Sequence, residues 1–142
     1  ADAQTPGSDL KESQAWYRMR LGEVLLSVGK LDEASAQLEA ALRDHPAYPA
    51  ALGLLARVRA AQTRDAEAIE LCEKAARITP EVATLVLAGD LRTKRGEAGA
   101  AAVFYGAVEQ AGADAIGARD LILYYCDHGR RLPRALELAE AE

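Results

Sequence analysis

An internal repeat of 34 residues is the feature of this sequence that most constrains its fold. Five pairs of like residues stand 34 positions apart: Leu21 and Leu55, Ala34 and Ala68, Leu38 and Cys72, Ala41 and Ala75, Pro46 and Pro80. Repetition at this period is typical of helix–turn–helix units, each of which buries its apolar face only against its neighbours. The repeat therefore predicts a stack of helical hairpins.

Composition favours the same class. Alanine, leucine, glutamate and arginine are strong helix formers and are abundant here, whereas aromatic residues make up only 5% of the chain. Sheets draw on β-branched and aromatic side chains, and this sequence contains too few of them for a sheet protein. We therefore predict an all-α fold.

The charges bear on the kind of partner. The formal net charge is −5, and the lysines and arginines are spread through the chain rather than clustered. Nucleic-acid binding depends on a dense basic face that neutralises phosphates, so we expect no nucleic-acid partner. No apolar stretch approaches the length needed to span a bilayer, and we expect no membrane insertion.

Turn and cap residues divide the chain into helices. Gly29 and Pro46 mark helix ends, Asp9 with Glu12 suggests a capping box before the first helix, and residues 79–81 suggest the start of the fifth. The predicted helices span residues 10–28, 32–44, 49–62, 65–78, 80–94, 98–111 and 114–128, and an eighth begins at residue 133. We expect residues 1–8 to be a flexible arm and residues 9–142 to be one domain, with repeats at about 15–48, 49–80, 81–114 and a truncated 115–142.

The period changes along the array. Between the second and third repeats the matching residues stand 32 apart: Leu55 and Leu87, Ala68 and Ala100, Cys72 and Phe104, Ala75 and Ala107. Between the third and fourth repeats the spacing is 35, as for Ala100 and Ala135. Because several positions shift together, each change indicates a single difference in loop length, the first of them at Pro80.

The pattern resembles the tetratricopeptide repeat family. With Ala15 as the first position, the first repeat matches the family's large–small pair at Leu21-Gly22 and its small, large, small and proline positions at Ala34, Leu38, Ala41 and Pro46. The fourth repeat is degraded, with Arg119 where a large apolar residue is usual. The resemblance implies a right-handed α-solenoid (a superhelix) of antiparallel hairpins, in which the first helix of each hairpin lines a concave groove.

The same resemblance implies which residues line that groove. The candidates for partner binding are Trp16, Met19, Arg20, Glu23, Arg57, Arg92, Asp120, Tyr124, Asp127 and His128. Trp16, Met19 and Tyr124 would anchor a docked segment, because aromatic and methionine side chains are common anchors. Alternatively, Trp16 packs as a lid on the first repeat and Tyr124 packs within the fourth.

Arginines could add specificity to the groove. Arg57 and Arg92 occupy the same or nearby positions on successive repeats and could hold a carboxylate or an acidic peptide by bidentate hydrogen bonds. Alternatively, they pair with Glu23, Asp90 and Asp120 as solvated surface ions.

Residues for catalysis are few. His45 and His128 lie at predicted helix ends, and neither has other ligands at metal-binding spacing. Asp127-His128 has no candidate nucleophile tied to it, and the glycines form no phosphate loop. Cys72 and Cys126 are expected to be buried thiols rather than a disulfide. We expect no enzyme activity, no metal and no cofactor.

The sequence therefore predicts a non-catalytic protein–protein interaction module that binds a partner peptide or helix in its groove. An alternative is a self-assembling scaffold, a homo-oligomer formed through the C-terminal edge, where Leu136, Leu138 and Ala139 lack a following repeat. The compartment stays open between the cytoplasm and export after removal of a leader. The chain also reads as a piece of a longer protein.

Overall fold

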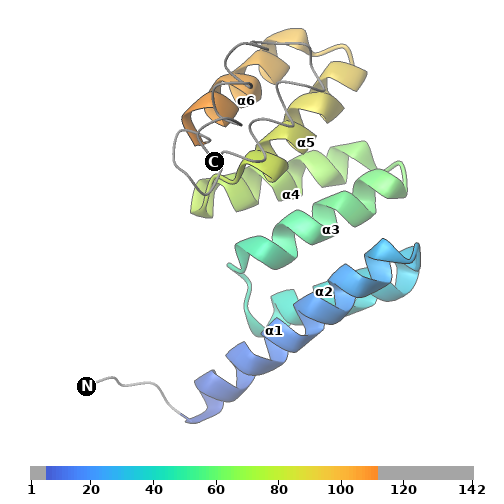
Figure 1. The fold of residues 1–142 in the computed structure, drawn as a ribbon, viewed down its shortest axis with the longest axis vertical. Helices are drawn as coiled ribbons and strands as arrows, with labels where there is room; N and C mark the ends of the chain where they lie inside the picture. The colour runs from blue at the N-terminus through green and yellow to red at the C-terminus, as the bar shows by residue number, and fades with distance from the viewer. Residues whose placement is uncertain (1–5, 112–142) are drawn as a thin grey trace, which may run out of the picture. The chain divides into compact units, whose positions relative to one another are not determined.

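The computed structural model describes residues 6–111, which form six helices and no strand (Figure 1). The helices are α1 (Pro6–Ser27), α2 (Leu31–Asp44), α3 (Pro49–Ala61), α4 (Asp65–Ile78), α5 (Val82–Lys94) and α6 (Ala98–Ala111). They pair as α1 with α2, α3 with α4 and α5 with α6. The predicted all-α helical-repeat fold is confirmed.

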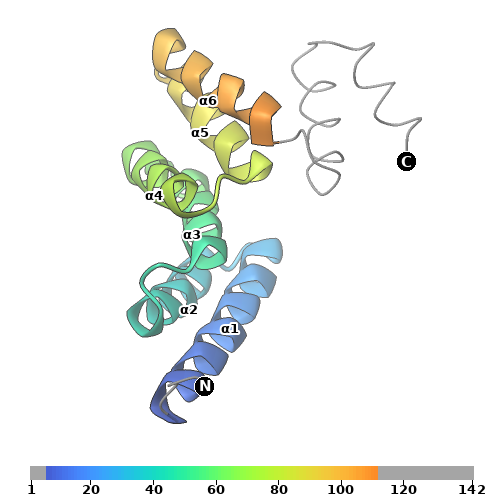
Figure 2. The same ribbon diagram turned by 90° about the vertical axis from the view of Figure 1, so that its left-hand side faces the viewer.

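The chain divides into two compact units, Ala1–Ile78 and Thr79–Glu142. In the first unit α2 packs on α3, and α1 also contacts α3. Figure 2 shows α1 and α3 on one side of this unit and α2 and α4 on the other. The first helices of the two hairpins therefore share a face. In the second unit the described helices are α5 and α6, which pack on each other.

Most predicted helix bounds agree with the structure to within one residue, but two starts differ. The first helix begins at Pro6 rather than residue 10, so Asp9 lies inside it and the predicted capping box is wrong. The fifth begins at Val82, with Glu81 as an extended N-cap residue that makes no side-chain cap hydrogen bond. Val82 is the first residue of α5 to be buried, so this helix begins where its apolar face begins. The predicted cap at residues 79–81 is therefore wrong.

The turn inside each hairpin repeats one geometry. Gly29, Thr63 and Gly96 all have positive φ, of 81°, 60° and 78°. In each turn the next residue donates its N–H to a carbonyl five residues back: Lys30 to Leu25, Arg64 to Arg59 and Glu97 to Arg92, at 2.8–2.9 Å. This is the Schellman motif, which closes a helix with one left-handed residue. Thr63 is the member with a β-branched side chain in that conformation.

The close approach of paired helices depends on a glycine in the first helix. A Cβ atom on Gly22 would lie 2.6 Å from Cγ of Leu38, and one on Gly89 would lie 2.5 Å from Cε1 of Tyr105. Real Cβ atoms do not come so near, so these glycines set the distance between α1 and α2 and between α5 and α6. Ala56 occupies the equivalent position in α3 and is fully buried.

These positions correct the predicted register of the third repeat. Its buried residues in α6 are Ala101, Tyr105 and Val108, each one position after the predicted Ala100, Phe104 and Ala107. Ala100 is exposed and Phe104 is only half-buried. Tyr105 thus matches Cys72 at a spacing of 33, not 32, and Gly96 matches Thr63 at the same spacing. The prediction failed because the run Ala98-Gly99-Ala100-Ala101-Ala102 offers a small residue in either register.

The core of the first unit runs between its hairpins. Leu38, Ala51 and Val58 are fully buried and belong to one cluster that draws on the first three helices. Small residues of α2 let its backbone come close, and the larger side chains fill the space between the helices. This core holds α1 and α3 side by side and so positions the surface described next.

Candidate interaction surface

Trp16 lies on α1 and is 49% exposed. Its ring meets that of Tyr17 edge-on, with 5.1 Å between the centroids, and the guanidinium carbon of Arg20 lies 6.0 Å from the Trp16 ring centroid. Arg20 also donates to Oε1 of Glu23 at 2.7 Å. An indole held beside a guanidinium and still half open to solvent can accept an apolar or acidic side chain of a ligand.

Arg57 lies on α3 at the position equivalent to Glu23 on α1, 34 residues later. Its side chain is exposed, and among residues 6–111 it forms no hydrogen bond or ion pair. The predicted alternative, in which Arg57 pairs with an acidic neighbour, is therefore not seen in the described part of the chain. Within this part of the chain no carboxylate is bound to its guanidinium.

Met19 is not a surface anchor, and that prediction is wrong. The side chain is only 7% exposed and packs in the core cluster with Ala15, Leu54 and Val58. Met19 follows Ala15 by one helical turn, so both lie on the same buried face of α1. Met19 supports the surface from below instead of lining it.

Arg92 does not occupy the position in its repeat that is equivalent to Arg57. With the corrected spacing of 33, Arg92 matches Arg59, and the position that matches Arg57 is Asp90. Arg92 is only a quarter exposed and donates to Oε2 of Glu97 at 2.6 Å. That hydrogen bond, followed by the charges of Arg92 and Arg95, holds the pKa of Glu97 below its usual value. The remaining predicted site residues Asp120, Tyr124, Asp127 and His128 lie outside the described residues.

Arg59 is an important residue that the sequence analysis missed. It is buried, and its guanidinium bonds Ser35 and Glu39 of α2, at 2.9 and 2.5 Å, and Glu67 of α4, at 3.1 Å. It also donates to the side chain of Gln62 at 3.0 Å. Arg59 therefore ties the first hairpin to the second. The sequence feature that could have revealed its burial is the helical spacing of Arg59 from Leu52, Leu55 and Ala56. This spacing places Arg59 on the buried face of α3.

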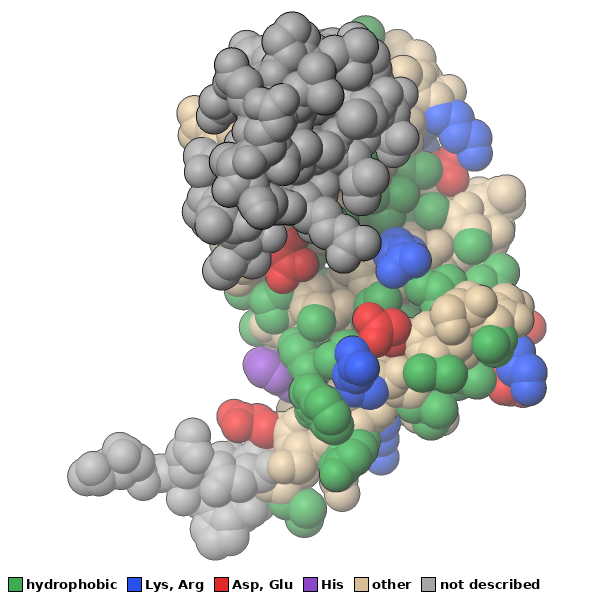
Figure 3. All heavy atoms as spheres, viewed as in Figure 1, with side chains coloured by type: hydrophobic (Ala, Val, Ile, Leu, Met, Phe, Trp, Pro, Cys, Tyr) green, Lys and Arg blue, Asp and Glu red, His purple; other side chains and the backbone are tan. Residues whose placement is uncertain are grey.

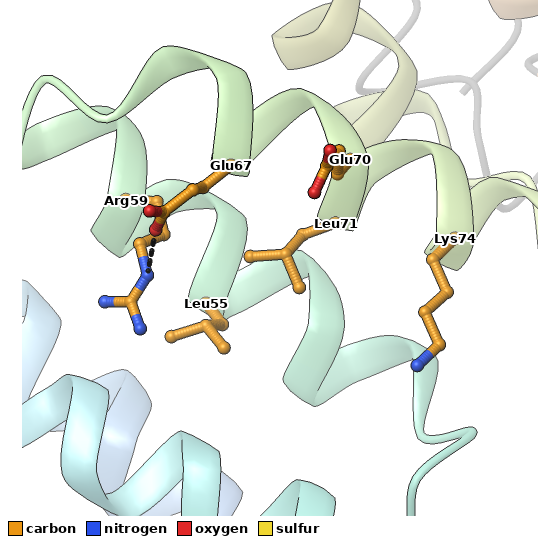
Figure 4. A pocket seen from close by; sticks show the side chains of 6 residues that line it. All are labelled: Leu55, Arg59, Glu67, Glu70, Leu71 and Lys74. Atoms are coloured by element: carbon orange, nitrogen blue, oxygen red, sulfur yellow. Dashed lines mark ion pairs between the residues drawn. The ribbon is translucent and has the colours of Figure 1, made fainter.

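A cavity of about 300 Å³ adjoins this network. Six residues of α3 and α4 line it: Leu55, Arg59, Glu67, Glu70, Leu71 and Lys74 (Figure 4). Lys74 lies at the end of the cavity away from the Arg59–Glu67 ion pair. The guanidinium of Arg59 is already paired with carboxylates of the protein. It is therefore not available to bind a further anion in this cavity.

The remaining reactive groups of residues 6–111 have structural roles. Cys72 is a buried free thiol, as predicted, and its burial, with a smaller effect of Glu73, raises its pKa to about 12. His45 follows α2, and its ring stacks on Tyr48 with 5.0 Å between the centroids. Within the described residues no group of three His, Cys, Asp or Glu side chains could hold a metal ion.

The helices of residues 6–111 are also too short or too polar to cross a membrane. Cys126, the other cysteine, lies outside the described residues.

Comparison with known proteins gives matches of two kinds. Residues 19–83 match the family model described as tetratricopeptide repeat. Among solved structures, one titled as the crystal structure of MamA has a TM-score of 0.68 at 18% sequence identity, over 89% of this chain and 79% of that one. No curated protein matches the sequence.

Another solved structure, YrrB, has a TM-score of 0.62 at 22% identity, over 85% of this chain and 63% of that one. Its title describes a tetratricopeptide repeat protein with an unusual peptide-binding site. At these identities the structural matches establish the fold alone.

Proposed function

Because this chain is a tetratricopeptide repeat protein, we propose that it is a non-catalytic protein–protein interaction module that binds a partner segment on the face shared by α1 and α3. Trp16, Arg20, Glu23 and Arg57 form the described part of the site. Proteins of this repeat family typically bind other proteins and lack catalytic activity. The partner is a peptide or a helix, and no nucleic acid is involved.

The observation that carries this proposal is that Arg57, which has no ion pair or hydrogen bond among residues 6–111, lies on the same face as the half-exposed Trp16. A guanidinium without a protein partner forms charge-assisted hydrogen bonds with a ligand carboxylate. Trp16 would bury against an apolar side chain of the same ligand. We therefore expect a ligand with an acidic residue and a nearby apolar or aromatic residue.

Peptide display on the intact chain tests this function. Selected peptides should be enriched in acidic residues next to large apolar ones. Arg57→Glu should weaken their binding about tenfold or more, equal to about 1.4 kcal/mol, because it replaces attraction by repulsion. Their affinity should also fall as salt is added.

Arg77→Glu provides the matched control, because Arg77 is exposed at the end of α4 and the charge change is identical. It should leave the affinity unchanged. Equal losses in both variants, or peptides with no acidic preference, would move the site away from this face. The alternative of self-assembly through the C-terminal edge concerns residues outside 6–111 and stays a prediction.

A further inference from the structure

An apolar stripe runs along α1 on a side that the described helices leave exposed. It consists of Leu10, Tyr17, Leu21 and Val24 of α1 and of Val28 in the turn that follows, all exposed, and we call it the α1 stripe. Successive members are 7, 4, 3 and 4 residues apart. Because residues three, four and seven apart lie on one face of a helix, the four side chains of α1 lie on one face. In Figure 3 hydrophobic side chains lie along the position of α1.

The next hairpin shows what covers this face of a first helix. The residues 34 positions after Tyr17, Leu21 and Val24 are Ala51, Leu55 and Val58 of α3, which are their equivalents in the next repeat. The α1 residues are 68%, 46% and 56% exposed, whereas their α3 equivalents are 0%, 5% and 0% exposed. The α3 residues belong to the cluster in which α2 packs against α3. The same face is therefore a helix-binding face in one repeat and open in the other.

We propose that the α1 stripe binds an amphipathic helix of a separate partner protein, seated as α2 is seated on α3. The partner's packing face should resemble that of α2, whose buried residues are Ala34, Ser35, Leu38 and Ala41. Small residues let the two backbones approach, and a leucine fills the space between Leu21 and Val24. Tyr17 is larger than Ala51, so the partner should carry a small residue opposite it.

The size pattern favours a partner helix over a second copy of α1. Two α1 stripes facing each other would place large side chains against large ones, with no small residue to bring the helices together. The interface of α2 with α3 instead combines alanine and serine with leucine and valine.

The charged residues beside the α1 stripe are already paired, and this distinguishes binding at the stripe from binding on the face of Arg57. Arg18 is paired with Asp44 at 2.5 Å, and Arg20 is paired with Glu23. The stripe itself contains no charged residue. Binding should therefore depend little on salt, whereas binding at Arg57 should weaken as salt is added. This inference does not rest on the function proposed above, because the two sites use different residues of α1.

A stapled helical peptide with the sequence of residues 31–44, the α2 sequence, is the probe for the intact chain. We expect saturable binding that changes the fluorescence of Trp16, which is the only tryptophan of the sequence and touches Tyr17. Leu21→Ser with Val24→Ser should weaken this binding about tenfold or more. Both residues are exposed, so circular dichroism should show an unchanged helix content.

Two further variants sharpen the test. Val103→Ser removes an exposed valine from α6 and should leave the peptide affinity unchanged. Tyr17→Ala gives α1 the residue that α3 carries at this position, so it should tighten binding of the α2 peptide by about threefold or more. A gain of affinity cannot arise from misfolding.

Several results would overturn the proposal. One is the absence of binding up to about 1 mM peptide, which is the limit of weak recognition. Another is equal affinity in the wild type and the Leu21→Ser/Val24→Ser variant. A third is concentration-dependent self-association that this variant abolishes, because the occupant would then be a second copy. Loss of binding in Arg57→Glu with the stripe variant unaffected would assign the peptide to the other face.

Discussion

At the scale of single residues, Thr63 stands in a conformation that suits glycine. It occupies the left-handed position of its turn, where the other two hairpins have Gly29 and Gly96. A β-branched side chain is disfavoured at positive φ because its Cβ crowds the backbone. The turn keeps Thr63 because the surrounding hydrogen bonds hold the same geometry as in the glycine turns.

Replacing Thr63 by glycine should therefore stabilise the protein. We expect Thr63→Gly to raise the free energy of unfolding by about 0.5–1 kcal/mol, the relief of strain being partly offset by the greater freedom of glycine in the unfolded chain. Urea unfolding followed by circular dichroism measures it. Gly96→Thr is the reverse experiment and should destabilise the protein; a loss of stability in Thr63→Gly would contradict the argument.

The Cys72 thiol should respond to pH in one direction. Its pKa rises from an ordinary value of 9.0 to about 12 in the folded state, mainly through burial. Below pH 9 both states bind the proton, so the stabilising effect is complete. Between pH 9 and 12 the unfolded chain loses the proton first, and stability falls.

A variant with Cys126→Ser isolates this thiol for measurement. Cys72 should react slowly with iodoacetamide at pH 8 in the native protein and rapidly in urea, because the thiol is both buried and protonated. Rapid labelling of the native protein at pH 8 would show that Cys72 is accessible.

At the scale of helices, Gly89 fixes how closely α5 approaches α6. Gly89→Ala would place a methyl group against the ring of Tyr105, so we expect a loss of about 1–3 kcal/mol in the free energy of unfolding. The higher helix propensity of alanine, about 1 kcal/mol, does not compensate for this overlap. Thermal and urea unfolding measure the change.

Gly106 supplies the control within the same hairpin. A Cβ atom there would meet nothing within 4 Å. Gly106→Ala should therefore stabilise α6 by up to about 1 kcal/mol. If Gly89→Ala and Gly106→Ala changed the free energy of unfolding in the same direction, crowding at Tyr105 would not explain why glycine is needed at position 89.

Arg59 joins two hairpins, and its removal should loosen that joint. We expect Arg59→Ala to lower the free energy of unfolding by about 2–3 kcal/mol through lost packing and lost hydrogen bonds to α2 and α4. Its carboxylate partners are half-exposed and stay hydrated, which limits the loss. Arg57→Ala, on the same helix but exposed, should change stability by less than about 0.5 kcal/mol. A similar loss of stability in both variants would contradict the role of Arg59 in joining the two hairpins.

The helices themselves could be predicted from the sequence because caps, turns and periodicity are local. The prediction of α4 and α6 was right at both ends. The register of α6 could not be read, because alanine and glycine fill five successive positions and only the packing of Tyr105 over Gly89 selects one alignment. Arg59 was overlooked and Met19 was wrongly placed on the surface for a related reason: their burial depends on the packing of neighbouring helices.

At the scale of the whole molecule, stability should be distributed over two units. The contacts of α1–α4 and those of α5–α6 fall in separate clusters. In repeat proteins each hairpin depends mainly on its neighbours, so local damage stays local. We expect Gly89→Ala to speed hydrogen exchange in α5 and α6 by at least about tenfold while α1–α3 change little. Uniform acceleration along the chain would indicate one cooperative unit instead.

The three identical turns have a consequence for how such a chain can change in length. Three residues separate the helices within each hairpin of residues 6–111, whereas four residues join the first of these hairpins to the second and three join the second to the third. The difference of one residue therefore lies in a loop between two hairpins and not inside a hairpin. Residues 45–48 and 79–81 are the places where hairpins could be spliced, duplicated or exchanged without remaking the pieces on either side.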